Sequence, residues 1–227
     1  MLYLLISAAI VGLILVPQWW VKRVFDLHRQ PSEDFPGEGA ELARHLLSLL
    51  ELQAITVQST PLGDHYDPKG QSLNLNPVHF RGKSLTAVVI VAHEIGHVIQ
   101  QKENNPWFHL RYRLAEITIK LEKAGSVAML LTPFVTLLFR MPAPGILLFA
   151  LGFSSMFCSI LVHLITLPVE FDASFNKALP ILLKGEYIKK EEEGAARRIL
   201  KAAAFTYVAS AMSNLLNVGR WIAMLRR

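Results

Sequence analysis

Cysteine is nearly absent from this chain of 227 residues, with Cys158 as the single example. One thiol cannot form an intrachain disulfide, and it cannot supply a cysteine-rich metal site. Lysine and arginine outnumber the acidic residues and give a formal charge of +5, but they are dispersed among acids and form no basic stripe with aromatic residues. The composition therefore gives no indication of a nucleic-acid partner.

Charged side chains are also missing from three long apolar stretches. Residues 1–21 and 124–139 contain none, and residues 141–169 contain none apart from a histidine. A helix needs about 20 apolar residues to cross a bilayer, so the first and third stretches are long enough, whereas the second is short and contains Pro133. These stretches predict a membrane protein.

The first apolar stretch indicates an anchor rather than a signal peptide. It has no basic residues before the apolar run, and it ends in Trp19 and Trp20 followed by Lys22 and Arg23. Interfacial aromatic residues followed by cations are typical of the cytoplasmic end of a retained helix. We therefore predict an N-terminal transmembrane anchor over residues 1–21.

The polar part of the chain after this anchor predicts a helix and a small sheet. Apolar residues at helical spacing predict an amphipathic helix over residues 38–52. Alternating side chains predict one strand over residues 54–60 and another over residues 72–76. The sequence Asp-Pro-Lys-Gly at 67–70 is a turn signal between them, so we expect a small antiparallel β unit.

An apolar helix is predicted over residues 84–102, with Ser84 as its N-cap, and it contains His93, Glu94 and His97 in the pattern H-E-x-x-H. Residues four apart lie on one face of a helix, so both histidines can place a nitrogen on one Zn²⁺, with the glutamate beside them as general base. The alternative is a core helix with hydrogen-bonded histidines. Zinc is favoured because three ionisable side chains in an apolar helix are costly unless paired or bound to a metal.

A catalytic zinc site needs a third protein ligand. The metzincin extension is missing, because Gln100 and Glu103 stand where its glycine and histidine would be. Two glutamates remain as candidates. Glu116 lies in the next charged segment, and Glu170 follows the second and third apolar stretches. These residue types alone leave both open.

Membrane topology favours the second candidate. Ligands of one metal lie on one side of the membrane, so the chain must cross an even number of times between His97 and Glu170. A transmembrane helical hairpin over residues 124–168 meets this condition. We therefore predict His93, His97 and Glu170 as the zinc ligands. Asp172 is predicted to orient a ligand histidine from the second shell, with a simple helix-terminal charge as the alternative.

Four segments of the chain resemble one known family. "DHYDPKGQSLNLN", "VVIVAHEIGHVIQ", "TLPVEFDAS" and "AARRILKAAAFTYVASA" occur in the order and spacing of the YugP-like neutral zinc metallopeptidases of bacterial membranes, and the resemblance spans nearly the whole chain. It implies a zincin-type fold anchored in the membrane. It also implies His93 and His97 as ligands, Glu94 as catalytic acid/base and Glu170 as third ligand.

The resemblance also gives a meaning to the alternating segment before the active-site helix. In zincins a substrate peptide pairs with an edge strand beside that helix. The residues expected to form this substrate strand are Leu73, Asn74, Leu75 and Asn76. A purely structural hairpin is the alternative.

The predicted fold is a mainly α membrane protein with a zincin-like H-E-x-x-H helix and the small antiparallel β unit. Its expected parts are the N-terminal anchor (1–21), a metallopeptidase region (22–123), the transmembrane hairpin (124–168), and a third-ligand helix followed by an apolar C-terminal helix (169–227). Whether residues 202–224 of that last helix span the membrane stays open.

The predicted function is that of a membrane-integral zinc metalloprotease, a hydrolase that cleaves peptide bonds with zinc-activated water and a glutamate general base. The protein is expected to be multi-pass in the cell membrane, with its active site facing the cytoplasm. The expected partners are Zn²⁺, the lipid bilayer and protein or peptide substrates, membrane proteins among them, and no nucleic acid. The alternative is a catalytically silent membrane scaffold or assembly factor that zinc stabilises.

Overall fold

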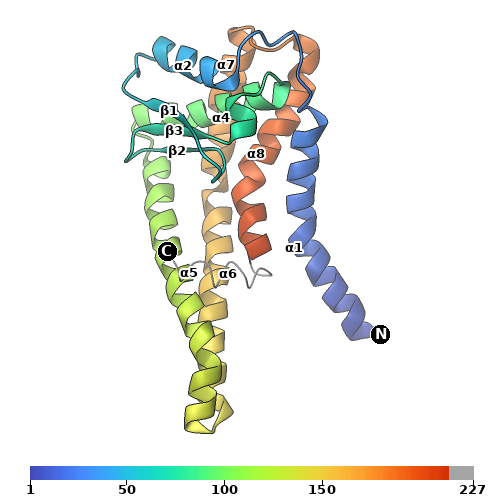
Figure 1. Ribbon diagram of the computed structural model, residues 1–227, viewed down its shortest axis with the longest axis vertical. Coiled ribbons are helices and arrows are strands. Elements are labelled where there is room, and N and C mark those ends of the chain that lie inside the picture. Colours follow the sequence, from blue (N-terminus) through green and yellow to red (C-terminus); the bar gives the residue numbers. More distant parts are fainter. Residues whose placement is uncertain (215–227) are drawn as a thin grey trace. The chain divides into compact units, whose positions relative to one another are not determined.

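The computed structural model of the chain describes residues 1–214, which are mainly helical with one small mixed sheet (Figure 1). In chain order, the described elements are α1 (Leu2–Leu27), α2 (Gly39–Leu49), β1 (Thr56–Ser59), β2 (His65–Asp67), β3 (Ser72–Leu75), α3 (Pro77–Phe80), α4 (Leu85–Lys102), α5 (Pro106–Phe139), α6 (Pro142–Phe171), the π-helix η1 (Asp172–Ala178), α7 (Leu179–Lys184), the 3-10 helix η2 (Lys190–Glu192) and α8 (Glu193–Asn214).

These elements divide into two compact units. We call Trp19–His109 together with Leu167–Thr206 the site unit, because it contains all of the predicted site residues. The other, the hairpin unit, consists of Met1–Gln18, Leu110–Thr166 and the described part of Tyr207–Arg227. Each unit is described by itself below.

Helix α4 lies at the centre of the site unit, and its bounds agree with the predicted helix. Ser84 caps its N-terminus, because the Ser84 hydroxyl oxygen accepts a hydrogen bond from the N–H of Ala87 at 3.3 Å. Beyond the last turn, Asn104 adopts a φ of +52°, the left-handed conformation that asparagine tolerates at helix ends. Nearly all side chains of α4 are buried, and His93, Glu94 and His97 are among them.

Apolar packing sets the rotation of α4 about its axis. The core of the site unit comprises Ala43, Leu46, Leu47, Leu73, Leu75, Val91, Ile95 and Val98, contributed by α2, β3 and α4. Burial of a leucine or isoleucine contributes about 1.5–3 kcal/mol, so this core favours one orientation of the helix strongly. Val91, Ile95 and Val98 share one face of α4, and His93 and His97 share another. The histidines therefore lie on a different face of α4 from these core residues.

The sheet differs from the predicted antiparallel unit, and the prediction was wrong in its strand order. The order is β1-β3-β2, with β1 parallel to β3 and β2 antiparallel to β3. The predicted turn at 67–70 does join antiparallel strands, but these are β2 and β3. Since β2 occupies residues 65–67, the chain reverses direction twice between β1 and β3, and two reversals make those strands parallel.

The hairpin unit contains two long apolar helices. α5 runs without interruption through the charged segment and the second apolar stretch, because no helix-breaking sequence separates them. α6 covers the third stretch after a short turn at Arg140 and Met141. Among the described residues, two helical segments, Pro106–Phe139 and Pro142–Lys184, are long and apolar enough to cross a membrane by length and composition.

Small residues allow α5 and α6 to approach closely. A β-carbon at Gly152 would lie 2.7 Å from the backbone oxygen of Gly125, and a β-carbon at Gly125 would overlap the side chain of Ser155. Small residues at such contacts are typical of helices that pack within membranes. Large apolar side chains elsewhere on these helices are exposed, with Leu137 at 78% and Leu138 at 77%, as expected for surfaces that face lipid.

Two predictions fall partly outside the described residues. The N-terminal stretch is helical in α1, but the side chains of residues 2–11, 13 and 14 lie outside the description, so the anchor stays a prediction. The structure describes α8 up to Asn214, and the remainder of the predicted apolar helix 202–224 lies beyond it.

Candidate metal centre

His93 and His97 lie one turn apart on α4. Their ring centroids are 4.8 Å apart, and the two ring planes are nearly perpendicular at 78°. Each residue is only 2% exposed. The H-E-x-x-H spacing therefore produces a pair of buried imidazoles on one helix face.

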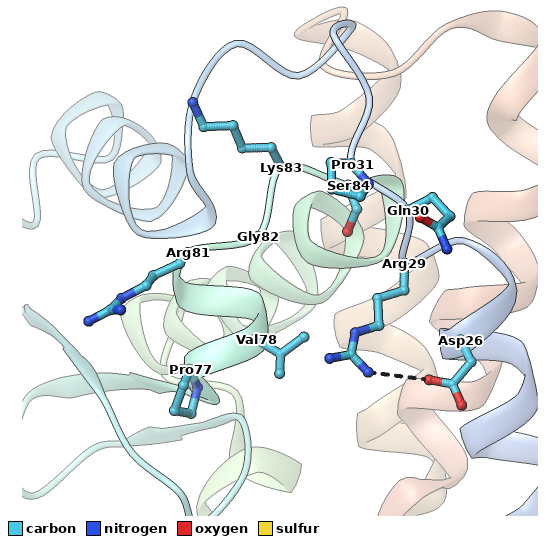
Figure 2. Close-up of a pocket in the computed structure, with 10 residues that line it drawn as sticks. All are labelled: Asp26, Arg29, Gln30, Pro31, Pro77, Val78, Arg81, Gly82, Lys83 and Ser84. Carbon is cyan, nitrogen blue, oxygen red and sulfur yellow. Dashed lines mark ion pairs between the residues drawn. The ribbon is translucent and has the colours of Figure 1, made fainter.

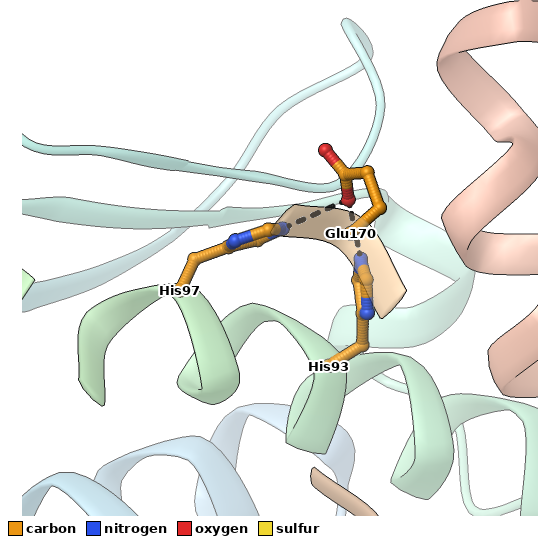
Figure 3. A group of neighbouring side chains, drawn as sticks. All are labelled: His93, His97 and Glu170. Carbon is orange, nitrogen blue, oxygen red and sulfur yellow. Dashed lines mark hydrogen bonds and ion pairs between the residues drawn. The ribbon is translucent and has the colours of Figure 1, made fainter. Parts of the chain in front are cut away.

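Glu170, the penultimate residue of α6, reaches this pair of histidines. Its Oε2 lies 3.4 Å from Nε2 of His93 and 3.2 Å from Nε2 of His97. Figure 3 shows the three side chains pointing toward one another from α4 and from the end of α6. One ligand atom from each residue lies within 4.8 Å of the other two, and all three residues are buried. Glu116, the other predicted candidate, is not a member of this group.

The converging atoms form a donor set that could hold a metal ion. Two imidazole nitrogens and one carboxylate oxygen suit Zn²⁺, which prefers nitrogen, sulfur and carboxylate oxygen ligands. Three buried acceptor atoms around one point also need a positive charge between them to offset the loss of solvation. The residues present therefore fit the zinc ion that the sequence predicts.

Gly96 allows the segment after α6 to lie directly against α4. A β-carbon at Gly96 would lie 2.5 Å from the backbone oxygen of Ala173, far inside van der Waals contact. The sequence signal of a glycine within an apolar helix is thus explained by close approach. This contact holds η1 against the helix that carries both histidines.

Each histidine has a polar partner on its other nitrogen. Nδ1 of His97 lies 2.9 Å from Oε1 of Gln100, and Nδ1 of His93 lies 3.0 Å from the hydroxyl oxygen of Ser174. Both partners are fully buried. Sequence reasoning missed them as site residues. The available signal was a glutamine three residues after His97, on the same face of an apolar helix.

Asp172 was predicted to orient a ligand histidine, and it contacts Gln100 rather than an imidazole. The Gln100 amide nitrogen donates to Oδ2 of Asp172 at 2.8 Å and to the backbone oxygen of Val169 at 2.9 Å. Asp172 also accepts a hydrogen bond from Asn176 at 2.7 Å. The aspartate therefore reaches His97 only through the glutamine. It opens η1, and π-helical turns are frequent at functional sites.

Glu94 lies on α4 directly after His93 and is 3% exposed. A glutamate on this helix turn is beside the histidine face and one turn before Val98, which belongs to the apolar core. A buried carboxylate at the border of a metal-ligand face is suitably located for proton transfer.

The predicted substrate strand is contradicted by the sheet. β3 contains Leu73, Asn74 and Leu75, and it is the central strand, paired on one side with β1 and on the other with β2. Its backbone has no open edge for a peptide. Asn76 lies outside the strand and caps α3, because its side chain accepts a hydrogen bond from the N–H of Val78. The prediction was wrong because side chains alternate in the same way along a central strand and along an edge strand, so the pattern does not distinguish them.

A separate hollow of about 800 Å³ lies near the N-terminal end of α4 (Figure 2). Asp26 and Arg29 form an exposed ion pair at 3.8 Å on one wall, and Arg81 and Lys83 contribute two further cations. None of the ten described residues that line it is a predicted site residue. This hollow is therefore not part of the candidate metal centre.

Two comparisons with known proteins gave matches. A family model described as "Putative neutral zinc metallopeptidase" matches residues 2–226. The chain is 32% identical over 224 residues to "Putative membrane protease YugP" of Bacillus subtilis (strain 168), a similarity that covers 98% of this chain and 96% of the relative. No solved structure matches.

Proposed function

Because the chain belongs to the family described as putative neutral zinc metallopeptidases, we propose that it is a membrane-integral zinc metalloprotease that hydrolyses peptide bonds. The observation that carries the proposal is the convergence of His93, His97 and Glu170, whose ligand atoms lie within 4.8 Å of one another in the protein interior. Two histidines and one glutamate, with a fourth position left for water or substrate, are typical of catalytic zinc sites. The relative described as a membrane protease supports the same class.

The chain's own residues divide the work of such a site. His93, His97 and Glu170 would hold Zn²⁺. When bound, the ion supplies a Lewis acid that polarises a carbonyl group and allows water to act as a nucleophile at neutral pH. Glu94 accepts the proton of the attacking water and returns it to the leaving amine, so the reaction consumes no net proton.

The proposed location is the cell membrane, with several crossings and with the metal centre facing the cytoplasm. The support comes from two helical segments with the length and composition of membrane spans between His97 and Glu170. Two crossings return the chain to the side from which it started. Lys22 and Arg23 follow the predicted anchor and favour the cytoplasm for that side. A site next to the end of a spanning helix is accessible to membrane proteins and peptides near the bilayer.

The open edge of β2 is the proposed contact for the substrate backbone. β2 is an edge strand, and of the two edge strands it is the one that packs against α4. The Tyr66 hydroxyl of β2 donates to Oε1 of Gln101, one turn after His97 on the same helix. A peptide that extends the sheet at this edge would run alongside the helix that carries the histidines.

Zinc content tests the proposal. The full chain, purified in detergent with zinc present, is expected to contain about one zinc per chain by mass spectrometry of the metal. Glu170→Ala and His97→Ala should lose the ion. Glu116→Ala is the matched control, because it removes the other glutamate considered as a third ligand, and it should keep the wild-type zinc content.

Two results would overturn the proposal. Zinc that is absent from the wild type after metal-replete purification would remove the metal centre. Zinc that disappears in Glu116→Ala and persists in Glu170→Ala would remove the ligand set. Circular dichroism of each variant separates a lost ligand from a lost fold.

A further inference from the structure

We propose that Gln100 is a positioning residue that keeps the ring proton of His97 on Nδ1, and that Asp172 acts on the metal centre only through Gln100. The inference concerns which nitrogen of the imidazole carries the proton. It rests on the proposed function in one respect, namely that Nε2 is the nitrogen that faces the metal.

The orientation of the Gln100 amide follows from its acceptors. The amide nitrogen lies 2.9 Å from the backbone oxygen of Val169 and 2.8 Å from Oδ2 of Asp172. A carbonyl and a carboxylate can only accept hydrogen bonds, so both amide hydrogens of Gln100 are used there. A flipped amide would place its oxygen against two acceptors. The oxygen is therefore the atom that faces His97.

The proton position on His97 follows from this orientation. Oε1 of Gln100 lies 2.9 Å from Nδ1 of His97, and an amide oxygen can only accept. Nδ1 must therefore be the donor, and Nε2 is the nitrogen left to face a cation. Nε2 lies 3.2 Å from Oε2 of Glu170. The ring is thus prepared to bind a cation at Nε2 without a change of tautomer.

His93 is held in the same tautomer by an independent contact. The Ser174 hydroxyl has one hydrogen, which it donates to the backbone oxygen of Leu200. The two oxygens are 3.2 Å apart. The hydroxyl oxygen can then only accept from Nδ1 of His93, at 3.0 Å. Nε2 of His93 is then the nitrogen that faces Glu170, at 3.4 Å, as in His97.

Burial makes these contacts effective. Gln100 and Ser174 are both 0% exposed, so no solvent competes for their hydrogen bonds. In a medium of low dielectric, a hydrogen bond is stronger and a wrongly turned amide is more costly than in water. The residues from 169 to 174 thus supply a metal ligand, the acceptors that orient Gln100, and the hydroxyl that holds His93.

The test compares Gln100→Met with Gln101→Met. The two glutamines are neighbours on α4 and receive the same substitution, but Gln101 contacts Tyr66 instead of a histidine. The first readout is ¹⁵N NMR of the histidine rings in the full chain, purified in detergent and stripped of metal. Wild type and Gln101→Met are expected to show Nδ1 of His97 protonated. In Gln100→Met part of the population should lose the proton from Nδ1, because only the Glu170 carboxylate, at Nε2, then attracts a ring proton.

The second readout is zinc affinity, measured by competition with a chromophoric chelator. Loss of a partner that orients a metal-binding histidine typically weakens metal binding 10- to 100-fold, and we expect Gln100→Met to fall in this range. Gln101→Met should stay within about twofold of wild type, the scatter expected for a residue outside the network. An unchanged tautomer and an unchanged affinity in Gln100→Met would overturn the inference.

A double-mutant cycle tests the role given to Asp172. Asp172→Ala should weaken zinc binding when Gln100 is present, because the amide is then free to turn. The same substitution in the Gln100→Met background should have no further effect beyond about twofold. Equal effects in both backgrounds would show that Asp172 acts directly. If the wild type binds no zinc at all, the proposed function fails, and the NMR comparison still decides the tautomer.

Discussion

Nε2 of His97 and Oε2 of Glu170 lie 3.2 Å apart, although 73 residues separate them in the chain. The intervening residues form the two long apolar helices α5 and α6. The contact therefore joins the residues that precede and follow the pair of long helices. Several consequences of this arrangement can be measured.

Glu94→Gln is expected to abolish peptide hydrolysis without loss of zinc. The amide cannot accept the proton of the attacking water, and general acid–base catalysis contributes about 10²–10⁴-fold to rate. We therefore expect kcat/KM for a fluorogenic peptide to fall at least about 100-fold, while the zinc content stays at the wild-type level. Full cellular activity of this variant would favour the zinc-stabilised scaffold instead.

Gly96→Ala is expected to destabilise the site unit. Alanine is favoured over glycine within a helix by about 1 kcal/mol, but the new methyl group would meet the backbone oxygen of Ala173 at 2.5 Å. Overpacking of this kind typically costs about 1–3 kcal/mol, so the clash should win. The measurement is the midpoint of thermal unfolding together with the zinc dissociation constant, and both should worsen.

Gly194→Ala is the matched control for this substitution. Gly194 lies in α8, and a β-carbon there would meet nothing within 4 Å. This variant should be neutral or slightly stabilised through helix propensity. Because the clash at Gly96 is with the backbone, Ala173→Gly should not rescue Gly96→Ala. Rescue would show that the side chain of Ala173 causes the defect.

Tyr66→Phe is expected to destabilise the protein by about 1 kcal/mol at neutral pH, since it removes the hydrogen bond to Gln101. Burial raises the pKa of the Tyr66 phenol above its ordinary value of 10.0, and the Asp67 carboxylate adds to the shift. A pKa that is higher in the folded state means that the phenol's contribution to stability is complete below pH 10 and is lost as the pH rises through the folded value.

The difference between wild type and Tyr66→Phe should therefore shrink above pH 10. Melting temperatures of both proteins, measured at neutral pH and again above pH 10, provide the comparison. Using the difference cancels the titration of the other tyrosines and lysines. A gap that stays constant or widens at high pH would contradict burial of the phenol as the cause.

Cys158 offers a native probe of membrane insertion. It is exposed on α6, and it is the single cysteine of the chain. In sealed vesicles we expect it to react slowly with a charged, membrane-impermeant maleimide, because lipid excludes the charged reagent. Solubilisation in denaturing detergent should restore rapid labelling. Rapid labelling in intact vesicles would place this part of α6 in water.

Cysteines introduced into a Cys158→Ser background would test the hairpin itself. Arg140→Cys lies in the turn between α5 and α6, and Gln53→Cys lies in the exposed turn before β1. In vesicles of one orientation, the impermeant reagent should label these two positions from opposite sides. Labelling of both from one side would contradict a hairpin that crosses the membrane twice.

Local signals in the sequence were sufficient for α4. Its apolar run, the Ser84 cap and the histidine spacing depend only on residues within a few turns. Such features can be recognised without knowledge of the tertiary structure. Glu170 required an additional argument from topology, because no local pattern links it to the histidines. His93, His97 and Glu170 could thus be predicted as one group from the sequence, although zinc binding itself stays a prediction.

The strand order of the sheet and the polar partners of the histidines, Gln100 and Ser174, could not be predicted in this way. β2 is three residues long, too short for an alternating pattern, and its insertion reversed the relative direction of β1 and β3. The role of Gln100 depends on where η1 lies against α4, which no property of α4 specifies. Likewise, α5 continued through a change in polarity, because polarity alone does not end a helix.

The separation of His97 and Glu170 along the chain also sets an order of events during synthesis. A ribosome that has completed His97 must add 73 further residues before Glu170 exists. At about 5–20 residues per second, this takes roughly 4–15 s. During that interval the nascent chain carries the two histidines without the carboxylate that completes the candidate metal centre. The group of three candidate ligands therefore becomes complete only after both long helices have been made, and under the proposed function no hydrolysis is possible before that point.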